Sequence, residues 1–166
     1  MAEVELRSPV SSELLRPLNG LLASLSKETL LRLAPDLHRI PVTVKQFFHR
    51  QGQPITDVYF PNDGVASITT ILSDGSMVEA ATVGDEGMLG FEAIFGAGAV
   101  AQGDTLLQVP GSTMEKLSVT AFRRELARGS ELQEIMGRYA QALIAQMMHS
   151  NACNAIHQVH ERCCRW

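Results

Sequence analysis

Positive charge is almost missing from the middle of this chain. Only Lys116 is basic between residues 51 and 122, against nine Asp and Glu residues, and the same span holds no arginine and no histidine. A phosphate group or a nucleic-acid backbone is bound mainly through Lys and Arg. The 166 residues carry a net charge of −4 without a basic stripe. We therefore expect this polypeptide alone to bind DNA poorly.

Cysteine and long apolar runs are scarce as well. The three cysteines, Cys153, Cys163 and Cys164, all lie in the last fourteen residues, so they cannot form a disulfide framework for the fold. No apolar run approaches the roughly 18 residues that span a bilayer. The N-terminal segment lacks the apolar core of a secretory signal. The sequence therefore predicts a cytoplasmic protein with reduced thiols and no membrane contact.

Sequence signatures of enzymes are missing too. The chain has no Gly-x-Ser-x-Gly elbow, no Walker A loop and no His-Glu-x-x-His helix. A metal-dependent enzyme with a jelly-roll fold, such as a cupin, needs histidines on its strands, and residues 51–122 have none. We expect a protein that is not an enzyme, with no catalytic residue and no cofactor.

What the chain does contain begins with short helices and then a strand-rich region, within one domain large enough for its own core. Up to about Pro41, Ser26 is the expected N-cap of a helix that Pro35 interrupts, with an apolar face of Leu30, Leu31, Leu33 and Leu37. Short β-favouring runs then alternate with turns rich in Pro, Asn, Asp and Gly, which is typical of an antiparallel sandwich or barrel. The expected strands cover residues 55–60, 65–72, 77–83, 105–109 and 113–117.

The last stretch is predicted to be helical, with a short helix at 121–127 and a long one from 131 to about 159. About 30 helical residues span roughly 45 Å, which is longer than a domain of this size covers by itself. The long helix therefore needs a partner for its apolar seam, and a second copy of the chain is the simplest one. The alternative is that the helix folds back on the β-region of its own chain. The seam residues expected at a homodimer interface are Leu132, Met136, Tyr139, Leu143 and Met147.

A glycine-rich loop lies inside the acidic region. Residues 84–103 include six glycines, and glycine at this density lets a backbone turn through positive φ angles or wrap closely around a ligand. A loop built to hold phosphate would also need a cation, and this loop contains none. The loop is therefore a candidate ligand site that does not suit an anion.

Short sequence matches, taken in order, give the chain a family resemblance. They are DVYFP at 57–61 with DGV at 63–65, VGDEGMLG at 83–90, VPG at 109–111, and 152–157 leading into 161–162 and 165–166. These matches and the order of the elements resemble the sensor half of the Crp/Fnr family of bacterial transcription regulators. The resemblance implies an α+β fold, an antiparallel β-roll (double-stranded β-helix or jelly roll) of the cyclic-nucleotide-binding type. Short N-terminal helices and a long C-terminal dimerisation helix would flank the roll.

The same resemblance divides the chain into three parts. Residues 1–130 would form the β-roll with its N-terminal helices, residues 131–160 the dimerisation helix, and residues 161–166 the start of a winged helix-turn-helix domain that is otherwise absent. The chain is thus expected to sense a small-molecule effector and to form a homodimer, with DNA bound only through the absent domain. The alternatives are a stand-alone binding or scaffold protein with this fold, or a metal or redox sensor.

The resemblance also bears on the ligand. In members of the family that bind cyclic nucleotides, a glutamate binds the ribose and an arginine some ten residues later binds the cyclic phosphate. Aligned on Gly90, this chain has Phe91 in place of the glutamate, and the arginine position falls near Ala101 or Gln102. An arginine–phosphate pair is about twice as strong as a neutral hydrogen bond, so we do not expect cyclic AMP to bind. The candidate pocket residues are Gly84, Glu86, Gly87, Gly90, Phe91, Glu92, Gln102, Met147 and Met148.

Two interpretations of this pocket stay open. One is a site for a less anionic or apolar effector, because methionine adapts to irregular ligands. The other is a collapsed pocket filled by Phe91, Phe95 and the two methionines. In either case we expect Asp85 and Glu86 to be loop caps rather than acid or base groups, because no histidine between residues 51 and 122 could act with them.

A stripe of histidine and cysteine forms a second, weaker candidate site. His149, Cys153 and His157 follow one another at intervals of four residues, so they project from one side of a helix, and His160 and Cys164 continue that side. Such a stripe can hold a soft transition metal or a redox-active thiol. Polar residues occur on helices for many other reasons, and we expect no bound metal.

Overall fold

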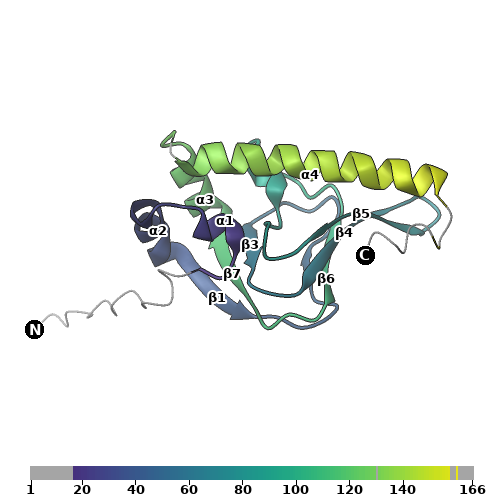
Figure 1. The fold of residues 1–166 in the computed structure, drawn as a ribbon, viewed down its shortest axis with the longest axis horizontal. Helices are drawn as coiled ribbons and strands as arrows, with labels where there is room; N and C mark the ends of the chain where they lie inside the picture. Colours follow the sequence, from purple (N-terminus) through teal and green to yellow (C-terminus); the bar gives the residue numbers. More distant parts are fainter. Residues whose placement is uncertain (1–16, 130, 158–159, 161–166) are drawn as a thin grey trace, which may run out of the picture.

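The computed structural model describes residues 17–129, 131–157 and 160. It contains two antiparallel sheets, one of three strands in the order β1-β7-β3 and one of four strands in the order β2-β6-β4-β5, with a long helix along one side (Figure 1). This architecture confirms the predicted α+β class with an antiparallel β-roll. The elements are α1 (Gly20–Ala23), α2 (Lys27–Leu33), η1 (Ala34–Asp36), β1 (Leu37–Pro41), β2 (Phe47–His49), β3 (Asp57–Pro61), β4 (Val65–Ile71), β5 (Met77–Val83), η2 (Phe91–Ile94), β6 (Asp104–Val109), β7 (Thr113–Ser118), α3 (Val119–Leu126) and α4 (Glu131–Ile156).

Capping residues begin the two short N-terminal helices. The side chain of Asn19 accepts hydrogen bonds from the first turn of α1, and its amide also donates to Pro61 O and Gly87 O, both at 2.9 Å. Ser26 caps α2 by accepting from Thr29 N at 3.4 Å, as predicted. Asn19 is fully buried, and these hydrogen bonds join the N-terminal helix to the strands and to the glycine-rich loop.

The first helical stretch ends earlier than predicted. Leu37, expected on the apolar face of a helix, begins β1 and pairs with Leu117 of β7. Pro35 lies in the 3-10 turn η1, where its missing N–H and fixed φ end the helical segment. Strand β2 was not expected as a separate element, since three residues are too few to show an alternating pattern.

The two turns at one end of the roll pack directly on each other. Gly64 has a φ of 75°, and a Cβ on it would lie 2.7 Å from Gly111 Cα. Asp63 fastens these turns, because its Oδ1 accepts from Ser112 N at 2.8 Å and its Oδ2 accepts from Ser112 Oγ at 2.5 Å. The hydrogen bonds from Ser112 hold the pKa of the Asp63 carboxyl below its usual value.

Buried apolar side chains form two clusters. One joins the N-terminal helices, α3 and the start of α4 around Phe60 and Phe122. The other fills the roll between the strands, around Leu107 and Met114. Tyr139 of α4 packs against both clusters, so the long helix is part of the core of its own chain.

Helix α4 contradicts part of the predicted dimer seam. Leu132, Met136 and Leu143 are at most 3% exposed within the single chain, and Tyr139 and Met147 are partly buried against the same core. Side chains buried this completely cannot contact a second chain, so the assignment of Leu132, Met136 and Leu143 to a homodimer interface is wrong, whereas that of the partly exposed Tyr139 and Met147 stays a prediction. The alternative, a helix folded back on its own β-region, describes this face of α4 (Figure 1).

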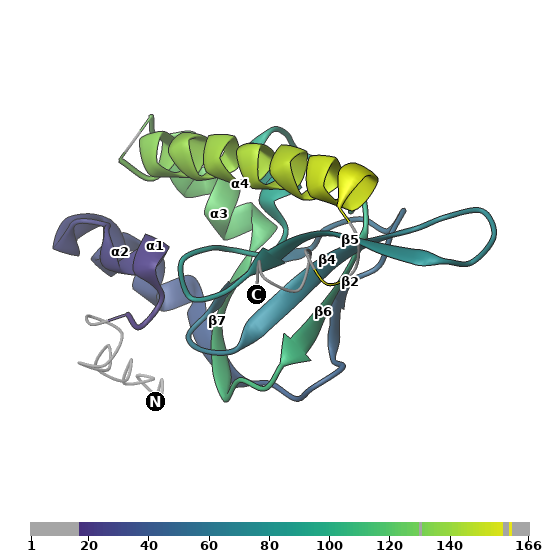
Figure 2. The same ribbon diagram turned by 45° about the vertical axis from the view of Figure 1, so that its right-hand side comes forward.

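The other face of α4 and its C-terminal half extend beyond the centre of the roll. Figure 2 shows the β4–β5 hairpin reaching out near this half of the helix, and Gln146 Nε2 donates to Thr82 O of β5 at 3.2 Å. The predicted start of a winged helix-turn-helix domain, residues 161–166, lies outside the described residues, as do Cys163 and Cys164. Among the described helices, none has the length and apolar character that a bilayer crossing requires.

Candidate functional site

Tyr139 fastens the first half of the glycine-rich loop to α4. Its hydroxyl donates to Met88 O at 2.9 Å and accepts from Met88 N at 3.1 Å. A Cβ on Gly87 would lie 2.8 Å from this hydroxyl, so the close approach requires glycine. Burial raises the pKa of Tyr139 above its usual value, which keeps the hydroxyl neutral and able to donate.

Glu86 and Asp85 stabilise this turn from within. Glu86 Oε1 accepts from Gly84 N at 2.9 Å, which confirms its predicted role as a loop cap. Asp85 contributes through its backbone, where its carbonyl accepts from Gly20 N at 2.6 Å. The segment from Gly84 to Gly90 is therefore a structural turn that supports the next part of the loop.

The short helix η2 is held at both ends by residues from other elements. It follows Gly90, which has a left-handed φ of 80°, and His49 of β2 lies directly against this glycine, because a Cβ there would be 3.0 Å from His49 Cε1. At the other end, Arg123 Nη1 donates to Ala93 O at 3.3 Å and to Ile94 O at 3.1 Å. Sequence reasoning missed both contacts, because His49 and Arg123 lie just outside the span from 51 to 122.

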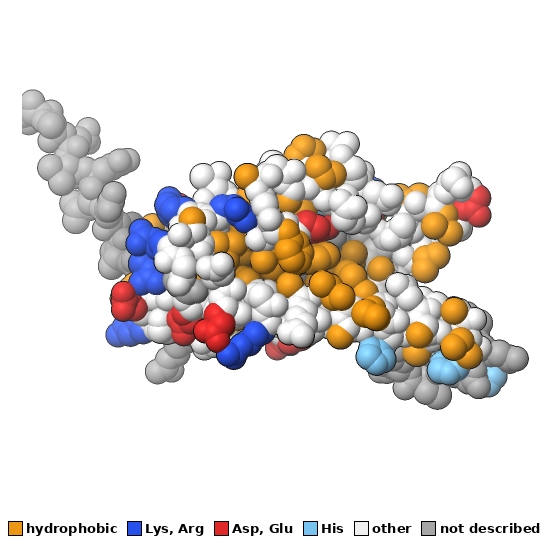
Figure 3. Space-filling view, turned by 90° about the horizontal axis from the view of Figure 1, so that it is seen from above, with side chains coloured by type: hydrophobic (Ala, Val, Ile, Leu, Met, Phe, Trp, Pro, Cys, Tyr) orange, Lys and Arg blue, Asp and Glu red, His pale blue; other side chains and the backbone are white. Residues whose placement is uncertain are grey.

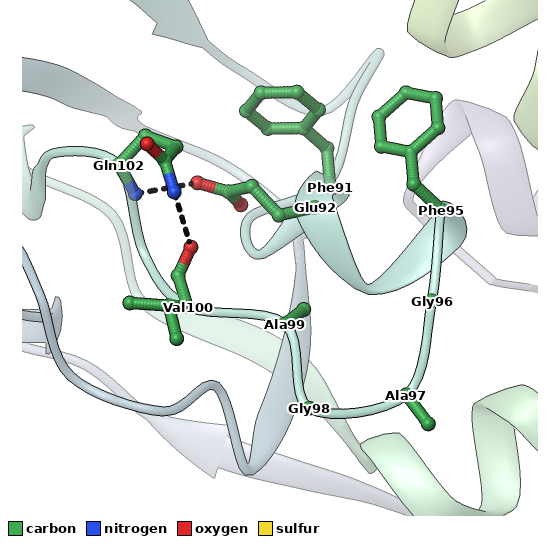
Figure 4. A pocket seen from close by; sticks show the side chains of 9 residues that line it. All are labelled: Phe91, Glu92, Phe95, Gly96, Ala97, Gly98, Ala99, Val100 and Gln102. Carbon is green, nitrogen blue, oxygen red and sulfur yellow. Dashed lines mark hydrogen bonds between the residues drawn. The ribbon is translucent and has the colours of Figure 1, made fainter.

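An open pocket of about 440 Å³ lies where η2 meets the loop that follows it (Figure 4). The rings of Phe91 and Phe95 meet edge to face with centroids 6.4 Å apart. Glu92 Oε1 accepts from Gln102 N at 3.0 Å, and the Gln102 amide donates to Val100 O at 3.0 Å. These bonds join the two sides of the loop around the pocket. The other lining residues are Gly96, Ala97, Gly98 and Ala99.

The pocket is apolar with one negative charge. Of the described residues that line it, Glu92 alone has an ionisable side chain. Two arginines beside the loop have other partners: Arg50 pairs with Asp104 at 3.0 Å and stacks over the Phe47 ring at 3.3 Å, and Arg123 binds the η2 carbonyls. A phosphate in this pocket would lose part of its hydration shell without gaining a cation as its partner, which is costly. A neutral or cationic apolar group would not carry this cost.

Several predicted pocket residues lie around this pocket, but not all of them form it. Phe91, Glu92 and Gln102 line the pocket. The remaining loop residues of the prediction lie in the structural turn that precedes it, namely Gly84, Glu86, Gly87 and Gly90. The high glycine content thus identified the loop correctly. It did not distinguish the supporting turn from the segment that lines the pocket.

The predicted methionines are placed differently. Met147 packs against the core, and Met148 is 67% exposed on the outward face of α4, so its assignment to the pocket is wrong. Phe95 is 65% exposed, so Phe95 and Met148 do not fill a collapsed pocket. Phe95 stands four residues after Phe91, and this spacing in the sequence was the available sign that two rings share one face.

The histidine and cysteine stripe lies on the outer part of α4. His149 Nδ1 donates to Ala145 O at 2.8 Å, as part of its own helix. Cys153 is a half-buried free thiol, and His157 is exposed. Among the described residues, no group of three or more His, Cys, Asp or Glu side chains is arranged to hold a metal ion.

No protein-family model matches the chain, and no curated protein matches it. Solved structures do resemble it. The c-di-GMP-responsive global regulator CLP of Xanthomonas campestris is 16% identical with a TM-score of 0.68, and the match covers 84% of this chain and 70% of that one. The sensor domain of the transcriptional regulator DNR from Pseudomonas aeruginosa is 18% identical with a TM-score of 0.58, over 90% of this chain and 95% of that domain.

A third neighbour is closer in sequence. A cyclic nucleotide-binding-like protein from Brucella abortus is 25% identical with a TM-score of 0.54, over 69% of this chain and 98% of that one. The structural neighbours are thus Crp/Fnr-type regulators and cyclic-nucleotide-binding domains, which confirms the predicted resemblance. The chain has the cyclic-nucleotide-binding jelly-roll fold with a long C-terminal helix.

Proposed function

We propose that this chain is the effector-sensing and dimerisation part of a Crp/Fnr-type transcription regulator, and that it acts by binding rather than by catalysis. The observation that carries the proposal is the open pocket on η2. It lies in the glycine-rich loop that supplies the nucleotide contacts in cyclic-nucleotide-binding members of the family. In such a regulator DNA is bound by a helix-turn-helix domain, which is not among the residues that the structure describes.

The effector that suits this pocket is a neutral or cationic apolar molecule. The two phenyl rings of Phe91 and Phe95 offer apolar and cation–π contacts, and the Glu92 carboxylate can accept a hydrogen bond from an amine or hydroxyl. A cyclic nucleotide would place its phosphate beside this carboxylate without an arginine to offset the charge. The pocket chemistry therefore favours an effector other than cyclic AMP.

Calorimetry and a thermal-shift screen test the effector. Cyclic AMP and cyclic GMP at millimolar concentration should give no saturable heat, and a micromolar isotherm would contradict the proposed ligand class. A screen of neutral and cationic aromatic compounds should find one that raises the unfolding midpoint, because a ligand that binds only the folded state stabilises it. Phe95→Ala should abolish that shift. Val44→Ala, at an exposed valine that does not line the pocket, should keep it.

The outward face of α4 supports the dimerisation part of the proposal. Ile144, Met148 and Ile156 are 45%, 67% and 78% exposed, and no Asp, Glu, Lys or Arg occurs from residue 139 to residue 160. A helix face in water normally carries charge, and an uncovered apolar stripe marks a contact surface. Figure 3 shows hydrophobic side chains gathered across the middle of this face of the molecule. A second copy of the chain fits this stripe because an uncharged apolar helix face is complementary to itself.

Light scattering tests this interface. At high micromolar concentration the parent chain should have about twice the monomer mass of 18.1 kDa. Ile144→Asp should give a monomer, because it places a carboxylate within the apolar contact. Gln133→Asp adds the same side chain at an exposed position in the first turn of α4 and should leave the dimer intact. A parent chain that is monomeric under these conditions would remove this part of the proposal.

A further inference from the structure

His49 is a buried titratable side chain that the proposed function does not use. It lies on β2 and is 8% exposed. Its Nε2 is 2.9 Å from Asp57 O, so Nε2 carries the proton and donates to this carbonyl. In the neutral ring Nδ1 is then an acceptor, and Nδ1 is buried without a hydrogen-bond partner among the described residues.

The ring of His49 supports the start of η2. The backbone of Gly90 lies so close that a Cβ there would be 3.0 Å from His49 Cε1 and 3.2 Å from Nε2. On another side the ring contacts Tyr59 of β3, with centroids 5.6 Å apart. If this ring requires a new hydrogen-bond partner, a neighbouring segment must move. Gly90 and η2 are not held in a sheet as Tyr59 is, so they are the segment that we expect to move.

Two carboxylates act on His49, one from β3 and one from η2. Asp57 of β3 is paired with Lys116 Nζ at 3.3 Å. Glu92 of η2 uses one oxygen to accept from Gln102 N. Burial lowers the pKa of His49 below its ordinary value of 6.5 in spite of these two carboxylates, so the ring is neutral in the present structure near pH 7.

We propose that protonation of His49 releases η2 from the β-roll, so that the glycine-rich loop opens as the pH falls. A protonated ring carries an N–H at Nδ1, and the present packing offers that N–H no acceptor, which is costly in the interior. The carboxylate of Glu92 lies on the segment that covers the ring and can supply the acceptor once η2 shifts and the bond to Gln102 N breaks. The inference stands on the packing of His49 against Gly90 at the start of η2, and it holds whether or not the pocket binds an effector.

The sign of the pH effect follows from linkage. The closed loop requires neutral His49, whereas in an open loop the ring takes up a proton with an ordinary pKa near 6.5. The open form therefore binds more protons below that pH, and the closed form loses stability as the pH falls. At about pH 5.5, one unit below the pKa of the ring in the open form, about ten open-form rings are protonated for each neutral one. The open population should therefore be about tenfold higher at about pH 5.5 than at about pH 7.5.

Hydrogen exchange of peptides from residues 84–103 measures this population directly. After correction for the intrinsic pH dependence of exchange, the parent protein should show about tenfold faster exchange at about pH 5.5 than at about pH 7.5. His49→Gln keeps a donor for Asp57 O without titrating, and it should abolish the difference. His38→Gln, at an exposed histidine of β1, should keep it.

Equal protection at the two pH values in the parent protein would overturn the proposal. So would an undiminished pH effect in His49→Gln. If that variant does not fold, an NMR titration of the His49 Cε1–H in the parent decides the question. A pKa below 6.5 with loop resonances that change over the same pH range is expected, and a pKa at or above 6.5 contradicts the proposal.

Discussion

Replacing Tyr139 by phenylalanine tests how the glycine-rich loop is attached to α4. The hydroxyl makes two hydrogen bonds, at 2.9 and 3.1 Å, to the carbonyl and the N–H of Met88, and Met88 is fully buried. The variant leaves both backbone groups without a partner in the interior, where each costs about 1–3 kcal/mol. We expect the free energy of unfolding to fall by about 2–4 kcal/mol, which lowers the thermal midpoint by about 4–16 °C for a chain of this size.

Urea unfolding followed by circular dichroism measures this change. The m-value should stay the same, because the surface exposed on unfolding is nearly unchanged. Tyr59→Phe is the matched control, since within the described part of the chain the Tyr59 hydroxyl makes no hydrogen bond and its loss should alter stability by less than about 0.5 kcal/mol. If Tyr139→Phe were within about 0.5 kcal/mol of the parent, the reasoning that these two bonds hold the loop would be refuted.

Four other substitutions give three further checks, each by the same unfolding measurement. Gly103→Ala should be strongly destabilising, because its Cβ would overlap a carbonyl of β4, whereas Gly96→Ala, with open space around it, should be nearly neutral; similar losses would contradict the steric argument. Arg39→Ala should lower stability by about 1–3 kcal/mol, because Glu115, 1% exposed, loses its 2.7 Å ion pair; an unchanged midpoint would show that the pair contributes nothing. Asp63→Asn should be less stable than the parent near neutral pH, because the pKa of Asp63 is lowered in the folded protein. The difference in stability should shrink as the pH falls below about 4, since the carboxylate stabilises the folded state only above the pKa that it has in the unfolded chain. A difference that does not change with pH would count against this role.

The strands and turns could be predicted well because their sequence pattern is local. The predicted runs at 65–72 and 77–83 correspond to β4 (Val65–Ile71) and β5 (Met77–Val83). The turn that precedes β4 contains Gly64 at a positive φ, as its Asn-Asp-Gly sequence suggests. Strand β2 escaped prediction because two of its three residues are phenylalanine and no alternation is visible.

The orientation of α4 could not be obtained from spacing alone. Leu132, Met136 and Leu143 recur at intervals that suit a partner helix and a β-roll equally well, because both bury a single stripe. The exposed residues Ile144 and Met148 lie on another side of the same helix. A helix with apolar residues on two faces gives a blurred pattern, and only tertiary packing shows which face belongs to the chain's own core.

The candidate site was predicted in part for a similar reason. Its glycines and the phenylalanine at position 91 are local in sequence, so the loop was found. His49 and Arg123 support η2 from β2 and from α3, many residues away, and no local pattern marks such contacts. The charge of a pocket is therefore predictable from its own loop, whereas the residues that fix the loop's position are not.

The attachment of the loop to two successive helices has a mechanical consequence. Tyr139 of α4 hydrogen-bonds to the backbone at Met88, and Arg123 of α3 hydrogen-bonds to it at Ala93 and Ile94. The two attachment points lie only a few residues apart on the loop but belong to different helices, so the loop connects α3 to α4. A displacement of the loop that keeps both sets of bonds changes how α3 and α4 lie relative to each other, and α4, one continuous helix from Glu131 to Ile156, carries that change along its length.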